Sequence, residues 1–160
     1  AGGGAIRRAT GWGAVLALPT IVVDLFGGFA QGINVPSPAA LLFYPLMALV
    51  AECVFHLVPL ALLALVLRAL RPEPVTSPAQ SIMVFAVALI EPSVQVAWGA
   101  GSSPAWANAF VGVNVLVFNV AGLQWFRRYD FFAMYAFRIG YYSTWHIAWG
   151  ALRLDILYGG

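Results

Sequence analysis

Residues 41–70 read LLFYPLMALVAECVFHLVPLALLALVLRAL, an apolar run with an acid and a histidine near its middle. A run of this length predicts a membrane-spanning helix, because about 20 apolar residues cross the bilayer core. Glu52 and His56 are four residues apart, so a helix places them one above the other on one face. Ionisable groups at this depth are costly, and they indicate either a structural pair or a functional site.

The composition of the whole chain is that of a polytopic membrane protein. Of its 160 residues, 62% are hydrophobic and 9% are charged, whereas soluble domains contain about 25% charged residues. The formal net charge of +2 gives no indication of nucleic-acid binding, and we expect the lipid bilayer as the surroundings. A single cysteine, Cys53, provides no basis for a disulfide framework.

Uncharged turns and a charged loop divide the chain into five predicted spans. We predict an all-α membrane helix bundle, a single transmembrane domain over residues 1–160, with a short interfacial helix at 131–137. Residues 31–39 and 101–104 form the uncharged turns, and residues 71–78 form the charged, proline-rich loop. The predicted spans are residues 12–30, 40–70, 79–100, 105–126 and 139–157.

The arginines predict the orientation of the bundle. Alternate predicted connections carry the basic residues, while the connections between them carry none, as the positive-inside rule describes. This pattern places the N-terminus in the cytoplasm and the C-terminus outside, and we expect a bacterial inner membrane. The arginines counted here are Arg7 and Arg8, Arg68 and Arg71, and Arg127 and Arg128.

Four titratable residues share a similar depth in three predicted spans, and they are the candidate catalytic residues: Glu52, His56, Glu91 and His146. An ionised group at the centre of a helix costs about 2.5 to 3.5 kcal/mol on insertion scales. We therefore expect the four to face one another across the bundle interior. A purely structural Glu52–His56 pair, and a role for Glu91 in stabilising a kink, remain alternatives.

Two prolines support this interior polar layer, because they add free backbone acceptors beside it. Pro92 leaves the carbonyl of Ala88 without its helical donor, and Pro59 does the same for Phe55.

Other polar residues point to helix packing. Asp24 is interpreted as a packing residue or as part of a mouth. The five-residue spacing of Asn114 and Asn119 predicts that at least one of them bonds another helix.

Two short motifs carry a resemblance to a known family. AECVFH at residues 51–56 and FRIGYYSTWHIAWG at residues 137–150 resemble the first and last motifs of the CPBP intramembrane proteases, the CAAX protease and bacteriocin-processing family also called Abi. The family patterns are EExxxR and, after an R-x-G step, HxxxN or HxxxD. The similar part covers residues 51–150, and the first span lies outside it.

The match of individual residues is incomplete. Glu52 falls on the second glutamate of the first motif, His146 on the last histidine, and Arg138 on the R-x-G step. Ala51 stands in place of the first glutamate of the first motif, and His56 in place of its arginine. Gly150 stands in place of the final Asn or Asp, and Leu89 in place of the histidine of the middle FxxxH motif.

The resemblance implies glutamate-dependent peptide hydrolysis, and the departures predict that this activity is degenerate. We therefore expect an accessory or scaffold subunit of a larger membrane complex, with other membrane protein subunits as partners. No cofactor, metal or nucleic acid is expected. The alternatives are a working CPBP-type endopeptidase that needs no metal, and a metal- or haem-binding subunit, since carboxylates and imidazoles suit Zn or Fe.

Overall fold

The computed structural model describes residues 1–70, 76–101 and 103–159, and these residues form helices and connections without any β-strand. The all-α prediction is confirmed. Most of the predicted loop at 71–78, including Arg71, and residue 102 of the predicted turn at 101–104 lie outside the described residues.

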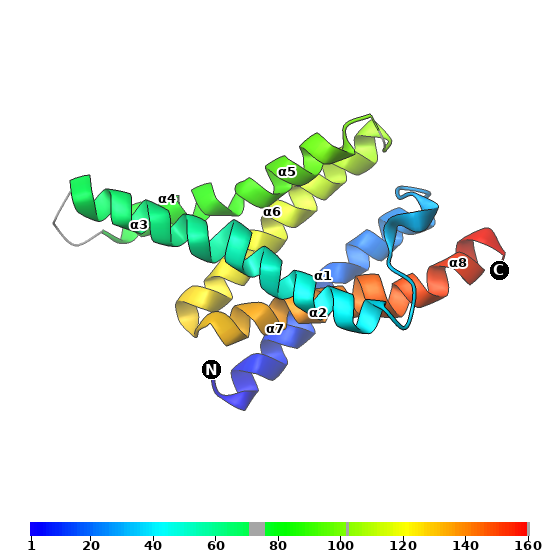
Figure 1. Cartoon of the computed structure of the whole chain (residues 1–160), viewed down its shortest axis with the longest axis horizontal. Coiled ribbons are helices and arrows are strands. Elements are labelled where there is room, and N and C mark those ends of the chain that lie inside the picture. The colour runs from blue at the N-terminus through cyan, green and yellow to red at the C-terminus, as the bar shows by residue number, and fades with distance from the viewer. Residues whose placement is uncertain (71–75, 102, 160) are drawn as a thin grey trace.

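Long helices alternate in direction along the chain (Figure 1). Two of them contain an internal π-helical turn, and one has a break at Leu89. The elements are α1 (Gly3–Leu25), the 3-10 turn η1 (Gln31–Ile33), α2 (Ala40–Ala51) with η2 (Glu52–Leu57) and α3 (Val58–Leu70), α4 (Ser77–Ala88), α5 (Ile90–Gly99), α6 (Ala105–Arg128), and α7 (Phe131–Tyr142) with η3 (Ser143–Trp149) and α8 (Gly150–Tyr158).

The last helix differs from the sequence prediction. It runs from Phe131 to Tyr158 without the expected break at Arg138 into an interfacial helix and a span. Asp130 caps its start, where the carboxylate accepts a hydrogen bond from the Ala133 amide at 3.1 Å. Arg138 is buried and paired with acids, so it does not need to reach the membrane surface and the helix continues through it.

Three helices are long and apolar enough to cross a membrane, at Ala40–Leu70, Pro78–Gly99 and Ala105–Arg128. The helices that contain α1 and α7 do not join this set. Buried charges explain part of this difference, because Asp24 lies in α1 and Arg138 and Arg153 lie in the last helix. Length and composition therefore support three of the five predicted spans.

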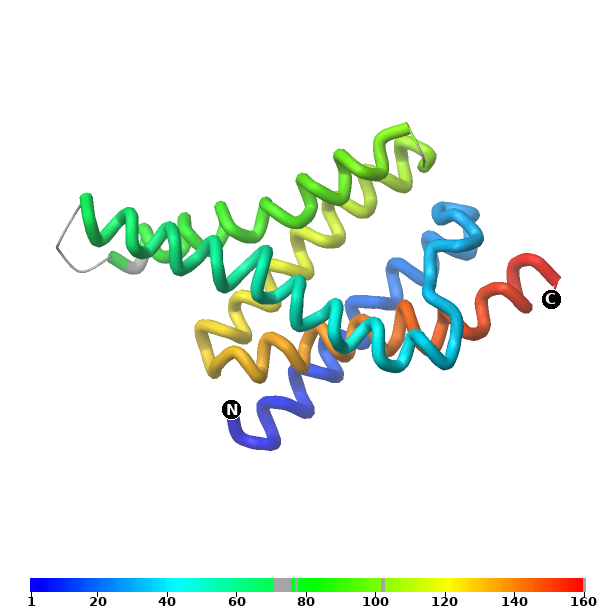
Figure 2. Tube along the Cα trace, viewed as in Figure 1, coloured from blue at the N-terminus to red at the C-terminus, as the bar shows by residue number. Residues whose placement is uncertain are grey.

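The helices cross near the middle of the molecule and diverge toward its ends (Figure 2). The N-terminus, the end of α3 and the α6–α7 turn lie toward one side, and the α1–α2 connection, the α5–α6 turn and the C-terminus lie toward the other (Figure 1). Arg8 donates a hydrogen bond to the Tyr129 hydroxyl at 3.3 Å, which joins the N-terminal part of α1 to the turn after α6.

Helices α1 and α7 approach until their backbones touch. A Cβ atom on Gly13 would lie 1.9 Å from the Phe137 carbonyl oxygen, and one on Gly140 would lie 2.0 Å from the Thr10 carbonyl oxygen. Both glycines are required because any side chain would overlap backbone atoms. This crossing fixes the position of α7, which carries Arg138.

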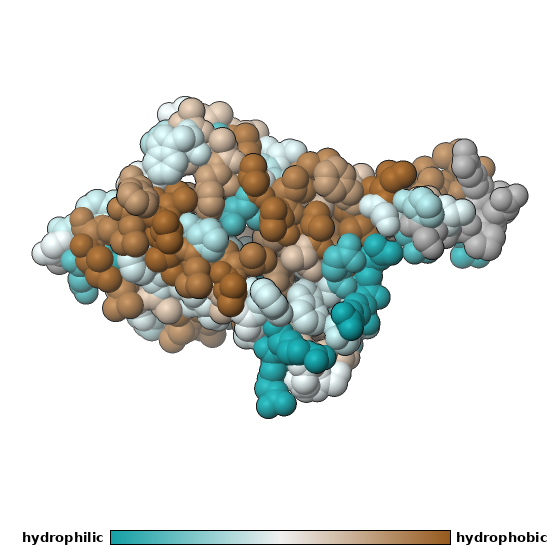
Figure 3. All heavy atoms as spheres, turned by 180° about the vertical axis from the view of Figure 1, so that it is seen from behind, coloured by the Kyte–Doolittle hydropathy of each residue, from teal (hydrophilic) through white to brown (hydrophobic). Residues whose placement is uncertain are grey.

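The outer surface agrees with a membrane location. Seen from behind, hydrophobic residues cover most of the body, and hydrophilic residues gather on the projection with the N-terminal end of α1 (Figure 3). Arg7 and Arg8, together with Arg127 and Arg128, are exposed.

Candidate functional site

A buried arginine lies at the centre of the candidate site. The Nε atom of Arg138 donates to Glu52 Oε1 at 2.6 Å, and its two terminal nitrogens donate to the two oxygens of Glu91 at 2.9 Å each. The three side chains are between 1% and 4% exposed. Arg138 on α7 therefore joins the helix of residues 40–70 to α5 through two buried ion pairs.

Glu52 and His56 form the contact that their spacing predicts. His56 Nδ1 lies 2.6 Å from Glu52 Oε2, so both oxygens of this carboxylate have a partner. Within the described residues, His56 Nε2 is buried and has no hydrogen-bond partner.

The π-helical turn η2 contains Glu52 and His56 and lies next to a proline. Pro59 has no amide hydrogen to donate to the Phe55 carbonyl, and its ring crowds that oxygen. The wider turn keeps other backbone bonds, since the Val58 amide donates to the Cys53 carbonyl. Such π-turns inside α-helices are frequent at functional sites.

Asn119 on α6 completes the cluster. Its amide oxygen accepts from Arg138 at 3.3 Å, and its amide nitrogen donates to the Ala88 carbonyl at 3.2 Å. This carbonyl is the one that Pro92 leaves without a helical donor. The carbonyl freed at the break between α4 and α5 therefore accepts a hydrogen bond from a neighbouring helix. The break at Leu89 also turns Glu91 toward Arg138.

Asn114 also bonds between helices. It donates to the hydroxyl of Thr20 on α1 at 3.2 Å and to the hydroxyl of Tyr141 on α7 at 3.0 Å. Both asparagines therefore connect helices, where the sequence required this of only one.

His146 lies apart from the acids. Its Nδ1 is 2.7 Å from Asn34 Oδ1, and its ring stacks on Tyr44 with centroids 4.3 Å apart. Tyr142 stands between His146 and the cluster, because its ring contacts His146 edge-on at 4.9 Å and its hydroxyl accepts from Arg138 at 3.4 Å. The structure brings Glu52, His56 and Glu91 together around Arg138, and it holds His146 in a separate hydrogen bond.

Asn34 fills the space above Gly150. A Cβ atom on Gly150 would lie 3.1 Å from Asn34 Nδ2 and 3.2 Å from Asn34 Cβ. An asparagine from the segment after η1 therefore occupies this space and bonds His146.

A third buried ion pair joins the end of α1 to α8. Arg153 donates to both oxygens of Asp24 at 2.7 Å, and the Trp149 indole donates to the same carboxylate at 2.7 Å. Arg153 also donates to the carbonyls of Ala30 and Gln31 at 3.2 and 2.6 Å. Asp24 is thus a fully paired buried acid that fixes the connection before η1.

Replacing Arg153 with glutamine is expected to lower the free energy of unfolding by about 2 to 3 kcal/mol. The buried carboxylate of Asp24 loses its counter-charge but keeps the Trp149 hydrogen bond, which limits the cost. Stability can be measured by SDS titration of the protein in maltoside micelles. The double variant Asp24→Asn/Arg153→Gln should recover part of the loss, and a double variant that is less stable than the single one would contradict the pairing argument.

A cavity of about 280 Å³ lies beside the cluster, between α1, α5, α6 and the last helix. Arg138 and Glu91 reach its wall, as does His146. Glu52 and His56 are not among its lining residues, nor do they line the neighbouring groove of about 500 Å³ between η2, α5 and α6. A solvent molecule in either space therefore meets Glu91 before Glu52.

Among the described residues, no group of three or more histidine, cysteine, aspartate or glutamate side chains is arranged to hold a metal ion. The acids instead face guanidinium groups. Sequence reasoning did not place Arg138 and Arg153 in the sites, although arginines inside predicted spans that also contain acids are a signal for ion pairing.

The chain was compared with protein-family models, with curated proteins and with solved structures, and none of them matches. The resemblance to the CPBP proteases accordingly rests on the residues at 51–56 and 137–150 alone.

Proposed function

We propose that this chain is a non-catalytic, CPBP-like membrane protein that serves as an accessory or scaffold subunit of a larger membrane complex. The observation that carries the proposal is the complete pairing of Glu52. A general base must reach water or substrate within hydrogen-bond distance. Each oxygen of Glu52 already has a partner at 2.6 Å, and the residue lines neither cavity.

The shape of the bundle supports a subunit role. Helix α3 has no buried residue among its thirteen, and it projects from the body beside α4 (Figure 1). Leu62 and Leu65 are 58% and 63% exposed, which leaves these apolar side chains free to face lipid or a partner. We propose that another membrane subunit packs on α3, in a bacterial inner membrane with the arginine-rich N-terminal side in the cytoplasm.

Site-directed crosslinking tests this proposal. In a Cys53→Ala background, Leu65→Cys on α3 is expected to crosslink to one membrane protein in native membranes. Val113→Cys on α6 is a matched control, because it is similarly exposed on a different face. Purification in mild detergent should bring down the same protein in stoichiometric amount. A partner-free monomer, or crosslinking from both positions alike, would contradict a specific subunit contact.

The surroundings of His146 favour a second candidate, a glutamate-dependent intramembrane endopeptidase. His146 is oriented by Asn34 and lines the same cavity as Glu91. In this arrangement Glu91 would be the acid that meets water and His146 the supporting donor. Against this candidate, both carboxylate oxygens of Glu91 already accept hydrogen bonds from Arg138.

Cleavage of a hydrophobic peptide separates the two candidates. The protease hypothesis predicts turnover by wild type that falls at least about a hundredfold in Glu91→Gln and His146→Ala. The non-catalytic proposal predicts that wild type and Glu52→Gln, Glu91→Gln and His146→Ala variants are equally inactive.

A further inference from the structure

The buried charges of the described residues do not balance. Three carboxylates, on Asp24, Glu52 and Glu91, accompany two guanidinium groups, on Arg138 and Arg153. Arg153 is matched by Asp24, so Arg138 alone faces both Glu52 and Glu91. Burying an uncompensated charge is expensive, so a further positive charge close to the central cluster would lower this cost.

His56 is poorly placed to supply this charge. As a neutral ring it donates from Nδ1 to Glu52 and leaves a lone pair on Nε2. As a cation it would bury a charged N–H on Nε2, which has no partner among the described residues. An unsatisfied charged donor costs more than an unsatisfied lone pair, so the surroundings of Nε2 do not compensate a positive charge on this ring.

The cavity of about 280 Å³ offers space for a cation next to Glu91. Aromatic side chains form much of its wall, including Phe29, Phe110 and Trp145. Aromatic rings attract cations, and quaternary ammonium groups are recognised by cages of this composition. The only arginine in the wall is Arg138, which two carboxylates already neutralise, so nothing in the described lining favours an anionic head group.

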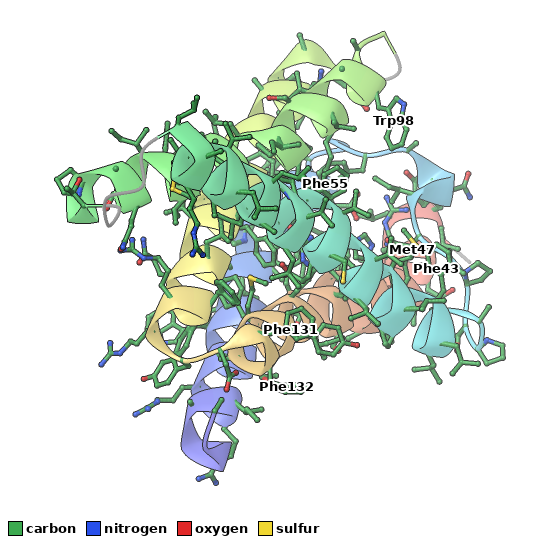
Figure 4. All side chains as sticks on the ribbon, turned by 60° about the vertical axis from the view of Figure 1, so that its left-hand side comes forward. Phe43, Met47, Phe55, Trp98, Phe131 and Phe132 are labelled. Atoms are coloured by element: carbon green, nitrogen blue, oxygen red, sulfur yellow. The ribbon has the colours of Figure 1, made fainter. Side chains whose placement is uncertain are left out.

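An apolar groove continues from this cavity toward the helix of residues 40–70. The cavity shares Glu91, Gln95 and Tyr142 with the groove of about 500 Å³. Met47 and Phe55 line that groove from the helix of residues 40–70, and Trp98 lines it from α5 (Figure 4). The volume of the groove lies in the range of small-molecule sites, which are mostly apolar with a few polar groups, and the volume of the cavity lies just below that range.

We propose that this cavity binds a lipophilic organic cation, with its ammonium group beside Glu91 and the aromatic wall and its apolar part in the groove. The ligand supplies the positive charge that the cluster lacks, and the aromatic rings of the wall replace part of the hydration of its ammonium group. The site is independent of the proposed subunit role, since α3 contributes no lining residue to either space.

Calorimetry on the full chain in uncharged maltoside micelles tests the proposal without any variant. Phenyltrimethylammonium and its carbon isostere tert-butylbenzene have the same shape and differ in charge. We expect the cation to bind at least about tenfold more tightly, after subtraction of empty-micelle titrations. Equal affinity for the isostere, or no saturable binding of the cation, would overturn the proposal.

Two variants locate the bound cation. Glu91→Gln removes the negative charge in the wall and should weaken cation binding at least about tenfold, while binding of the isostere stays unchanged. Ser93→Ala is the control on the same helix, because Ser93 is exposed and its hydroxyl donates to the carbonyl of Leu89, at the break before α5. Unchanged cation binding in a folded Glu91→Gln protein would refute the assigned position.

Discussion

Replacing Arg138 with glutamine is expected to lower the free energy of unfolding by about 3 to 5 kcal/mol, the cost of removing one partner from a buried ion pair. Two buried carboxylates would then face each other with no cation between them. The change also removes the donor to Asn119 and the contact between the guanidinium and the Phe118 ring, whose centroid is 5.0 Å from Cζ. Unfolding by SDS titration in maltoside micelles measures the loss.

The matched control is Arg128→Gln. Arg128 is exposed at the end of α6, and the change should alter stability by no more than about 0.5 kcal/mol. The triple variant Glu52→Gln/Glu91→Gln/Arg138→Gln should be more stable than Arg138→Gln alone, because no unpaired charge remains. A single variant as stable as wild type, or a triple variant less stable than the single one, would show that charge pairing does not hold these helices together.

The local part of this cluster could be predicted from the sequence. Four-residue spacing on one helix brought Glu52 and His56 into contact, and Pro92 identified the carbonyl of Ala88 as a free acceptor. Both conclusions depend only on helix geometry within a few residues. They hold although η2 is a π-helix, because its wider turn still brings side chains four residues apart within reach.

The non-local part could not be predicted, because depth in the membrane does not determine rotation about a helix axis. His146 shares a similar predicted depth with Glu52, yet it bonds Asn34 and stacks on Tyr44. Arg138 was expected at a helix break near the membrane surface. Its burial is explained by Glu52 and Glu91, which pair with it from two other helices.

The contact between α1 and α7 leaves a signal in the sequence that charge analysis overlooks. Small residues recur every fourth position at Ala5, Ala9, Gly13 and Ala17, and this face of α1 is buried. Such stripes let membrane helices approach closely. The partner could not be named from α1 alone, because it depends on Gly140 in a helix far along the chain.

Replacing Gly13 with leucine is expected to lower the free energy of unfolding by at least about 3 kcal/mol, the upper end of the usual cost of overpacking. The new Cβ would lie 1.9 Å from the Phe137 carbonyl oxygen and 3.0 Å from the Tyr141 amide nitrogen. These are backbone atoms of α7, so rotation of a side chain cannot relieve the overlap. Helix α1 would have to move away from α7 along their whole contact.

Gly11→Leu is the control, because a Cβ at Gly11 meets no atom within 4 Å. It should leave stability unchanged or slightly raised, since leucine favours a helix more than glycine does. SDS titration of both variants measures the difference. Equal stability of the two leucine variants would mean that the close backbone contact does not hold α1 in place. A large loss at Gly13 alone would show that α7, and with it Arg138, depends on this glycine for its position.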